Sequence, residues 1–120
     1  MKIIYKQSKE MTIKREKDGM LTDVIVSYLY ENNKEAGISI NVNNSTEVIF
    51  KDTKELFNAK LNEEFWEEML WQCGNREKIN NSEAVELSSI VDELIKEVNT
   101  GINQYYIDYE LYHFEIIQRF

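Results

Sequence analysis

The chain has 120 residues, which is the length of one compact domain and leaves no room for a second. Its hydrophobic fraction of 42%, its charged fraction of 30% and its lack of Pro exclude collagen-like and Pro-rich disordered proteins. Its 14 Lys and Arg against 22 Asp and Glu give a net charge of −8, which disfavours partners that are bound through their phosphates. We therefore expect one folded domain, residues 1–120, that binds neither nucleic acid nor an anionic membrane.

Catalytic and metal-binding side chains are scarce, because the chain has one Cys and one His. Cys73 lies on the apolar stripe of a predicted helix, without a nearby His to act as its base. Glu110 and His113 have the spacing of a di-iron ligand element, but the second copy that such a site requires is missing. We expect a protein that is not an enzyme and that uses no cofactor or metal ion.

The start of the chain does not resemble a secretion signal. The apolar run of Ile3, Ile4 and Tyr5 ends at Lys6, whereas a signal peptide needs about 7–15 apolar residues. No stretch approaches the roughly 18–20 apolar residues that cross a bilayer, and the unpaired Cys73 fits a reducing compartment. These observations predict a cytoplasmic location.

Residues 1–50 are predicted to form antiparallel strands. In residues 38–42, Ile38, Ile40 and Val42 alternate with polar residues, which is typical of a strand with one wet face. Turn residues at 43–45 separate this strand from the next one, at 48–50. Asp18 and Gly19 are a two-residue hairpin signal between segments 11–17 and 21–31. Segment 21–31 is apolar on both faces, so we expect it at the centre of the sheet. The basic residues of segment 1–20, Arg15 among them, suit either contact with nucleic acid or an acidic partner or a place on a sheet edge, where Lys opposes aggregation, and we favour the sheet edge.

Helical spacing replaces strand alternation after residue 51. A capping box at residues 52–55 predicts a short helix, and Asn62 is expected to cap a longer one that ends at Cys73 before Gly74. A third helix is predicted from a Ser82 cap to Asn99. The predicted buried stripes are Phe65, Trp66, Met69, Leu70 and Cys73 on the second helix, and Ala84, Leu87, Val91, Leu94, Ile95 and Val98 on the third.

The tail, residues 103–120, fits either a strand or a helix, and its Tyr and Ile content favours a strand with a bulge near Tyr112. The predicted fold is therefore α+β: an N-terminal antiparallel β-meander of four to five strands, two to three helices packed on one face, and a C-terminal strand or helix.

Trp71 is the first candidate for partner binding. At about 100° per residue it lies roughly 170° from the centre of the buried stripe of its helix. Glu64, Glu67 and Glu68 surround it on the outer face, and an aromatic ring among carboxylates is typical of a hot spot for a basic surface. The alternative is that Trp71 packs under the loop at residues 74–81 as part of the core.

Two further surfaces are candidates. Glu86, Glu93 and Glu97 align on what we predict to be the outer face of the third helix, although solvated helix faces often have this composition. In the tail, aromatic and acidic side chains alternate, either as an interface or as packing within the sheet. The candidate residues in the tail are Tyr105, Asp108, Tyr109 and Glu110.

These features favour a small acidic inhibitor that binds a basic protein. The most specific form of this hypothesis is an immunity protein that neutralises a bacterial nuclease toxin, because nucleases present Lys and Arg to phosphates. Abundant Ile, Asn and Lys with scarce Ala are typical of AT-rich coding sequences, as in many bacteria and phages. One alternative is a phage or mobile-element inhibitor of a host defence protein, and another is a homo-oligomeric structural or adaptor protein. The sequence leaves the oligomeric state open.

Overall fold

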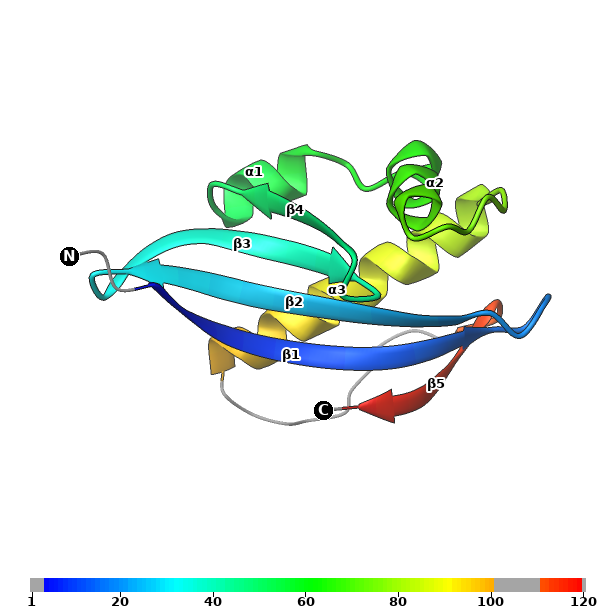
Figure 1. Cartoon of the computed structure of the whole chain (residues 1–120), viewed down its shortest axis with the longest axis horizontal. Helices are drawn as coiled ribbons and strands as arrows, with labels where there is room; N and C mark the ends of the chain where they lie inside the picture. Colours follow the sequence, from blue (N-terminus) through cyan, green and yellow to red (C-terminus); the bar gives the residue numbers. More distant parts are fainter. Residues whose placement is uncertain (1–3, 101–110, 120) are drawn as a thin grey trace.

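The computed structural model describes residues 4–100 and 111–119, and within them an antiparallel sheet of five strands carries three helices on one side (Figure 1). The strands follow the order β4-β3-β2-β1-β5, so the last strand in the chain pairs with the first. The predicted α+β fold is confirmed. The elements are β1 (Ile4–Arg15), β2 (Leu21–Glu31), β3 (Lys34–Val42), β4 (Thr46–Phe50), α1 (Thr53–Asn58), α2 (Glu63–Gln72), α3 (Asn81–Thr100) and β5 (Phe114–Arg119).

Two of the hairpin turns depend on paired asparagines. Asn32 and Asn33 have φ angles of 52° and 63°, and Asn43 and Asn44 have φ angles of 56° and 54°. Two successive residues at positive φ give a turn whose twist matches that of the flanking strands, and Asn tolerates this conformation better than other residues with a side chain. The turn predicted at residues 43–45 is therefore confirmed.

The hairpin between β1 and β2 is longer than predicted. Its loop spans residues 16–20 rather than two residues, with Gly19 at φ +74°. The backbone N–H of Gly19 donates to the carbonyl of Arg15, and the Asp18 carboxylate accepts from the N–H of Met20. The loop is longer because Asp18 turns back toward the end of β1.

β2 is the central strand, as predicted from its two apolar faces. Val24, Val26 and Tyr28 are buried on the side that carries the helices, and Ile25 and Leu29 are half-buried on the opposite side. One edge of β2 pairs with β1 and the other edge pairs with β3.

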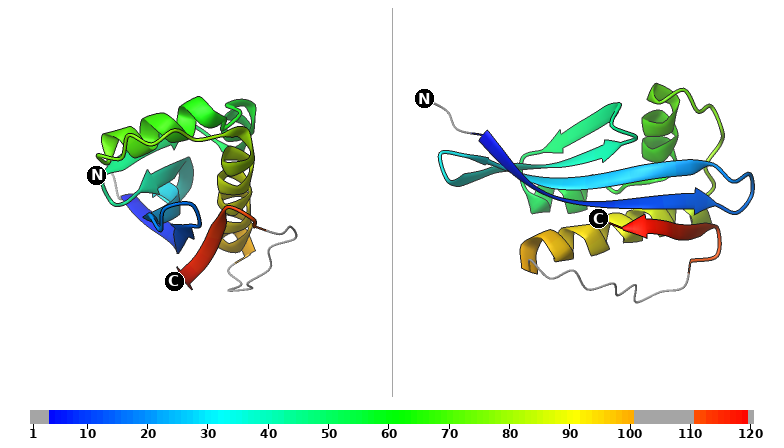
Figure 2. Two further views of the ribbon diagram at one scale, coloured as in Figure 1. Left: turned by 90° about the vertical axis from the view of Figure 1, so that its right-hand side faces the viewer. Right: turned by 60° about the horizontal axis from the view of Figure 1, so that its bottom comes forward.

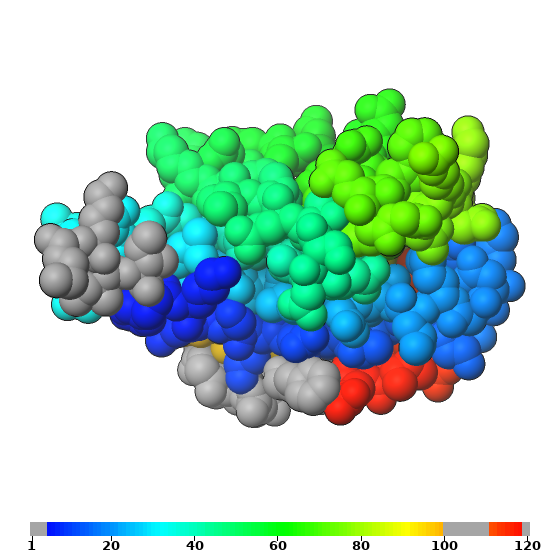
Figure 3. Space-filling model, in the orientation of Figure 1, coloured from blue at the N-terminus to red at the C-terminus, as the bar shows by residue number. Residues whose placement is uncertain are grey.

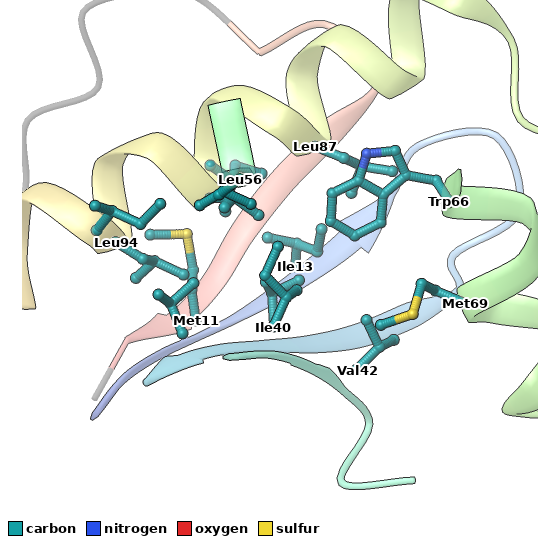
Figure 4. Packing of buried hydrophobic residues seen from close by; sticks show 14 of the residues in the cluster. Met11, Ile13, Ile40, Val42, Leu56, Trp66, Met69, Leu87 and Leu94 are labelled. Atoms are coloured by element: carbon teal, nitrogen blue, oxygen red, sulfur yellow. The ribbon is translucent and has the colours of Figure 1, made fainter. Parts of the chain in front are cut away.

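The helices divide the inner face of the sheet between them. Seen along the long axis of the molecule, α1 and α2 line one side of the core and α3 lines another (Figure 2). α3 packs on β1 and β2, whereas α1 packs on β3 and β4, and α2 packs on β4 and α3. Each helix brings apolar side chains to one continuous core (Figure 4), represented by Met11, Ile13, Ile40, Val42, Leu56, Trp66, Met69, Leu87 and Leu94.

The buried stripes predicted for α2 and α3 are confirmed, although Phe65 and Cys73 are only half-buried. Trp66 fixes α2 against α3: its Nε1–H donates to the Ser88 hydroxyl (3.2 Å), which itself donates to the Leu61 carbonyl (2.7 Å). The indole is thus buried without leaving its polar N–H unpaired.

α3 (Asn81–Thr100) begins two residues earlier than the Ser82 cap predicted, because Asn80 caps it instead. The Asn80 side chain accepts from the N–H of Glu83 (2.8 Å), and the Glu83 carboxylate accepts from the N–H of Asn80 (3.1 Å). This reciprocal capping box satisfies two backbone donors that the helix itself leaves free.

The preference for a strand over a helix in the tail is confirmed for residues 114–119, which form β5. Residues 112–113 form a bend ahead of this strand, so the predicted strand does not continue through Tyr112. The pairing of β1 with β5 contains an irregularity, between Thr12 and Ile13. In the part of the chain that the structure describes, no helix combines the length and the apolar character needed to cross a membrane.

Candidate protein-binding surface

The outer face of α2 is acidic and carries an exposed indole. Trp71 is 54% exposed, and Glu64 and Glu68 on the same face are also exposed. The predicted outward position of Trp71 is confirmed, and the alternative that it belongs to the core is wrong. The helix Glu63–Gln72 contains four Glu and no Lys or Arg. α2 therefore presents a large amphipathic ring within a field of negative charge.

The first turn of α2 stabilises its own charges. The Asn62 side chain accepts a hydrogen bond from the N–H of Phe65 (3.1 Å) and caps the helix. Backbone hydrogen bonding at this N-terminus, followed by a hydrogen bond from Asn81, lowers the pKa of Glu63. Carboxylates near a helix N-terminus are favoured by the unpaired N–H groups there, so the acidic face of α2 and its helical fold support each other.

Glu67 has a different role from the one predicted. It is half-buried, and its Oε1 accepts a hydrogen bond from the backbone N–H of the buried Ile79 (3.0 Å). Glu67 thereby fastens the loop after α2 to the helix. The same loop places the Arg76 guanidinium over the Trp71 ring, at 5.4 Å from its centroid. The indole therefore already receives a cation from within the chain.

A shallow groove runs between α2 and β4 with a volume of about 270 Å³. Apolar atoms of Val48, Phe65 and Met69 line it, and Glu47 and Glu68 lie at its rim. Figure 3 shows α2 and its following loop beside the β3–β4 hairpin at one end of the visible face. The groove thus adjoins the exposed face of α2 through Glu68.

The prediction that Glu86, Glu93 and Glu97 form an outward face is wrong. Their exposed fractions are 6%, 8% and 3%. The exposed side of α3 is instead the row that contains Val85, Asp92, Lys96 and Asn99. The glutamates lie on the flank of the helix, about 100° around from this row at roughly 100° per residue.

Glu86 is covered by the segment that leads into β5. Its carboxylate accepts from the backbone N–H of His113 (2.9 and 3.1 Å) and also contacts the ring Nδ1 of His113. The apolar stripe of α3 identified the helix face that meets the sheet, but it did not indicate that a distant segment covers the neighbouring flank. The tail candidates Tyr105, Asp108, Tyr109 and Glu110 lie outside the described residues.

Arg15 is a buried residue that sequence reasoning placed on a sheet edge. It is fully buried, because β5 pairs with β1 there and brings Phe114 opposite it. Its guanidinium donates to both Asp18 oxygens (3.1 and 2.6 Å) and to Glu83 (3.3 Å), with Glu77 at 3.8 Å. The sequence did hold a signal for this burial: Arg15 follows Met11 and Ile13 at every second position, so all three share one face of β1.

The charges of this cluster stabilise one another. The hydrogen bond from Arg15 holds the pKa of Asp18 at about 2, below its ordinary 3.8, and the same hydrogen bond raises the pKa of Arg15. Both ions are therefore charged at neutral pH. The cluster joins the β1–β2 hairpin to the start of α3, because Arg15 binds both Asp18 and Glu83. Since Arg15 is fully buried, its charge is not accessible to a partner.

Within residues 4–100 and 111–119, no group of three or more His, Cys, Asp or Glu side chains is arranged to hold a metal ion. Cys73 is half-buried, with its Sγ 3.4 Å from the carbonyl of Val42 and 3.3 Å from the Thr46 hydroxyl. Comparison with protein-family models, with curated proteins and with solved structures finds no match for this chain.

Proposed function

We propose that this chain is an acidic protein-binding inhibitor that captures a basic protein on the outer face of α2. The observation that carries the proposal is the 54% exposure of Trp71 on a helix with four Glu and no Lys or Arg. An aromatic anchor supplies affinity once the partner has docked, and the surrounding carboxylates select a cationic surface.

The most specific partner is a nuclease toxin, which makes the chain an immunity protein. A nuclease must present Lys and Arg to phosphates, so carboxylates that occupy this surface also exclude its substrate. The contact between Arg76 and Trp71 supports such a partner, because it shows that the ring accepts a guanidinium in this environment. A cation of the partner replaces Arg76 or stacks on the opposite side of the ring.

The test uses the protein encoded next to the gene for this chain, which the proposal expects to be a basic nuclease. Its nuclease activity is measured with and without an equimolar amount of the chain, and association and dissociation rates are followed by stopped-flow. We expect inhibition, with an association rate that falls as salt screens charges beyond a Debye length of about 8–10 Å. Glu64→Gln with Glu68→Gln is expected to lower the association rate by about tenfold.

Trp71→Ala is expected to accelerate dissociation by about 30-fold, the effect of losing roughly 2 kcal/mol of hot-spot contact. A matched control is Glu35→Gln with Glu115→Gln, which removes two exposed charges from β3 and β5. Equal effects of the two double variants would locate the interface away from α2. If the neighbouring protein is not inhibited, the immunity role is wrong. If the chain instead inhibits a host defence nuclease, it is a phage or mobile-element inhibitor.

A further inference from the structure

We propose that the free edge of β4 binds an extended basic segment of the partner as an added antiparallel strand. The inference rests on the proposed capture of a basic protein, and it states how the partner is held beside α2. It concerns the groove between β4 and α2 together with the backbone of residues 46–50.

β4 is a terminal strand of the sheet. Its one paired side faces β3, with Val42 opposite Thr46 and Ile38 opposite Phe50. Among the described residues, no backbone hydrogen bond joins the other side of β4 to another element. Figure 2 shows β4 at the margin of the sheet beyond β3. A row of backbone donors and acceptors is therefore available for pairing.

β4 carries little of the usual protection of such an edge. Proteins guard edge strands with Pro, Lys or other charges, a bulge or short length, and Thr46–Phe50 has only its length of five residues and one charge. Its single charged residue is Glu47, and Ile49 is 57% exposed beside it. An exposed aliphatic side chain and an acidic one thus flank the free backbone, which favours a ligand strand that is both apolar and basic.

The groove supplies the side-chain contacts that such a strand needs. Side chains of an extended segment alternate between the two faces, so every second one points to the side of the sheet on which α2 lies. There the apolar lining of Val48, Phe65 and Met69 receives an aliphatic side chain in about 270 Å³. Glu68 at the rim attracts Lys or Arg, and Glu47 does so in exchange for its exposed ion pair with Lys6 (3.7 Å).

Charge disfavours a second copy of this chain as the occupant. Each chain carries a net charge of −8, so two copies that pair through β4 repel each other. A basic segment replaces this repulsion by attraction. Lys51 and Lys54 follow the far end of β4, so the cations of the segment lie toward Thr46 and α2.

The direct test uses a blocked seven-residue peptide that alternates Lys and Val, compared with a Lys-Pro peptide of equal charge that cannot pair as a strand. Binding is measured by titration, and amide hydrogen exchange of the full chain is followed residue by residue. We expect the Lys-Val peptide to bind at least about tenfold more tightly than the Lys-Pro peptide, which corresponds to one or two backbone hydrogen bonds. We also expect slower exchange within residues 46–50 and no change in β5.

Equal affinity for the two peptides, or slower exchange on α2 without any in residues 46–50, overturns the edge proposal. Slower exchange in β4 that appears in the free chain as its concentration rises also overturns it, because a second copy is then the occupant. The two proposals fail separately. If Glu47→Lys leaves inhibition of the neighbouring protein intact while Glu64→Gln with Glu68→Gln weakens it, the edge proposal is wrong. Capture of the partner on α2 is then retained.

Discussion

Replacing Arg15 with Met is expected to lower the free energy of unfolding by about 3 kcal/mol. The Arg15 side chain is fully buried and is the cation that faces the buried carboxylate of Glu83. Met fills much of the same space but donates no hydrogen bond, so Glu83 loses its cation partner while remaining buried. Breaking a buried ion pair in this way costs about 3–5 kcal/mol.

The lower end of that range applies because both carboxylates keep other partners. Glu83 still accepts from the N–H of Asn80 (3.1 Å), and Asp18 is about one-third exposed and still accepts from Met20 (3.0 Å). In a domain of this length, a loss of about 3 kcal/mol lowers the melting temperature by roughly 12 °C.

Urea denaturation followed by circular dichroism at neutral pH measures the effect. Lys14→Met is the matched control: this neighbouring residue is exposed on the other face of β1, and the substitution removes the same charge. Its expected effect is within about 0.5 kcal/mol. The double variant Arg15→Met with Glu83→Gln is expected to cost less than the sum of its parts by about 1–3 kcal/mol. Equal losses for Arg15→Met and Lys14→Met, or strictly additive single effects, would refute the reasoning.

Three further outcomes follow from the structure. Because the pKa of Asp18 is lowered to about 2 from 3.8, its stabilising contribution is complete above about pH 4 and is lost as the pH falls toward 2. With screening of this partly exposed group, Asp18→Asn is expected to remove about 1 kcal/mol at neutral pH and to flatten the acid dependence of the urea midpoint. Trp71→Phe is expected to leave a blue-shifted emission from buried Trp66 that acrylamide barely quenches, whereas readily quenched emission would place Trp66 in solvent. Gly37→Ala is expected to cost about 1–3 kcal/mol in urea denaturation, because its Cβ meets the Phe50 carbonyl oxygen at 2.8 Å; an unchanged midpoint contradicts this close approach.

Local periodicity was sufficient for much of the fold. The alternation of Ile38, Ile40 and Val42 identified β3, and apolar residues on both faces identified β2 as central. The stripe of α2 also predicted the exposure of Trp71 correctly, because Trp71 lies opposite the apolar side chains through which the helix packs on the core. The Asn-Asn turn after β3 could be predicted because positive φ is tolerated by few residue types.

Non-local contacts decided the rest. Glu86, Glu93 and Glu97 have the spacing of a solvated helix face, yet they are buried, and for Glu86 the covering contact comes from His113. Glu67 is equally hidden from a local pattern, because its partner Ile79 lies in the following loop.

Arg15 illustrates the limit most clearly. A charged residue in a strand is ordinarily solvated, and only the return of β5 to β1, about a hundred residues later in the chain, encloses it together with Asp18 and Glu83. The local pattern of a chain determines which side of each element is apolar. The tertiary structure decides which polar side chains are also removed from water, because burying a charge is favourable only when a partner of opposite sign, here brought from a distant part of the chain, compensates for its lost hydration.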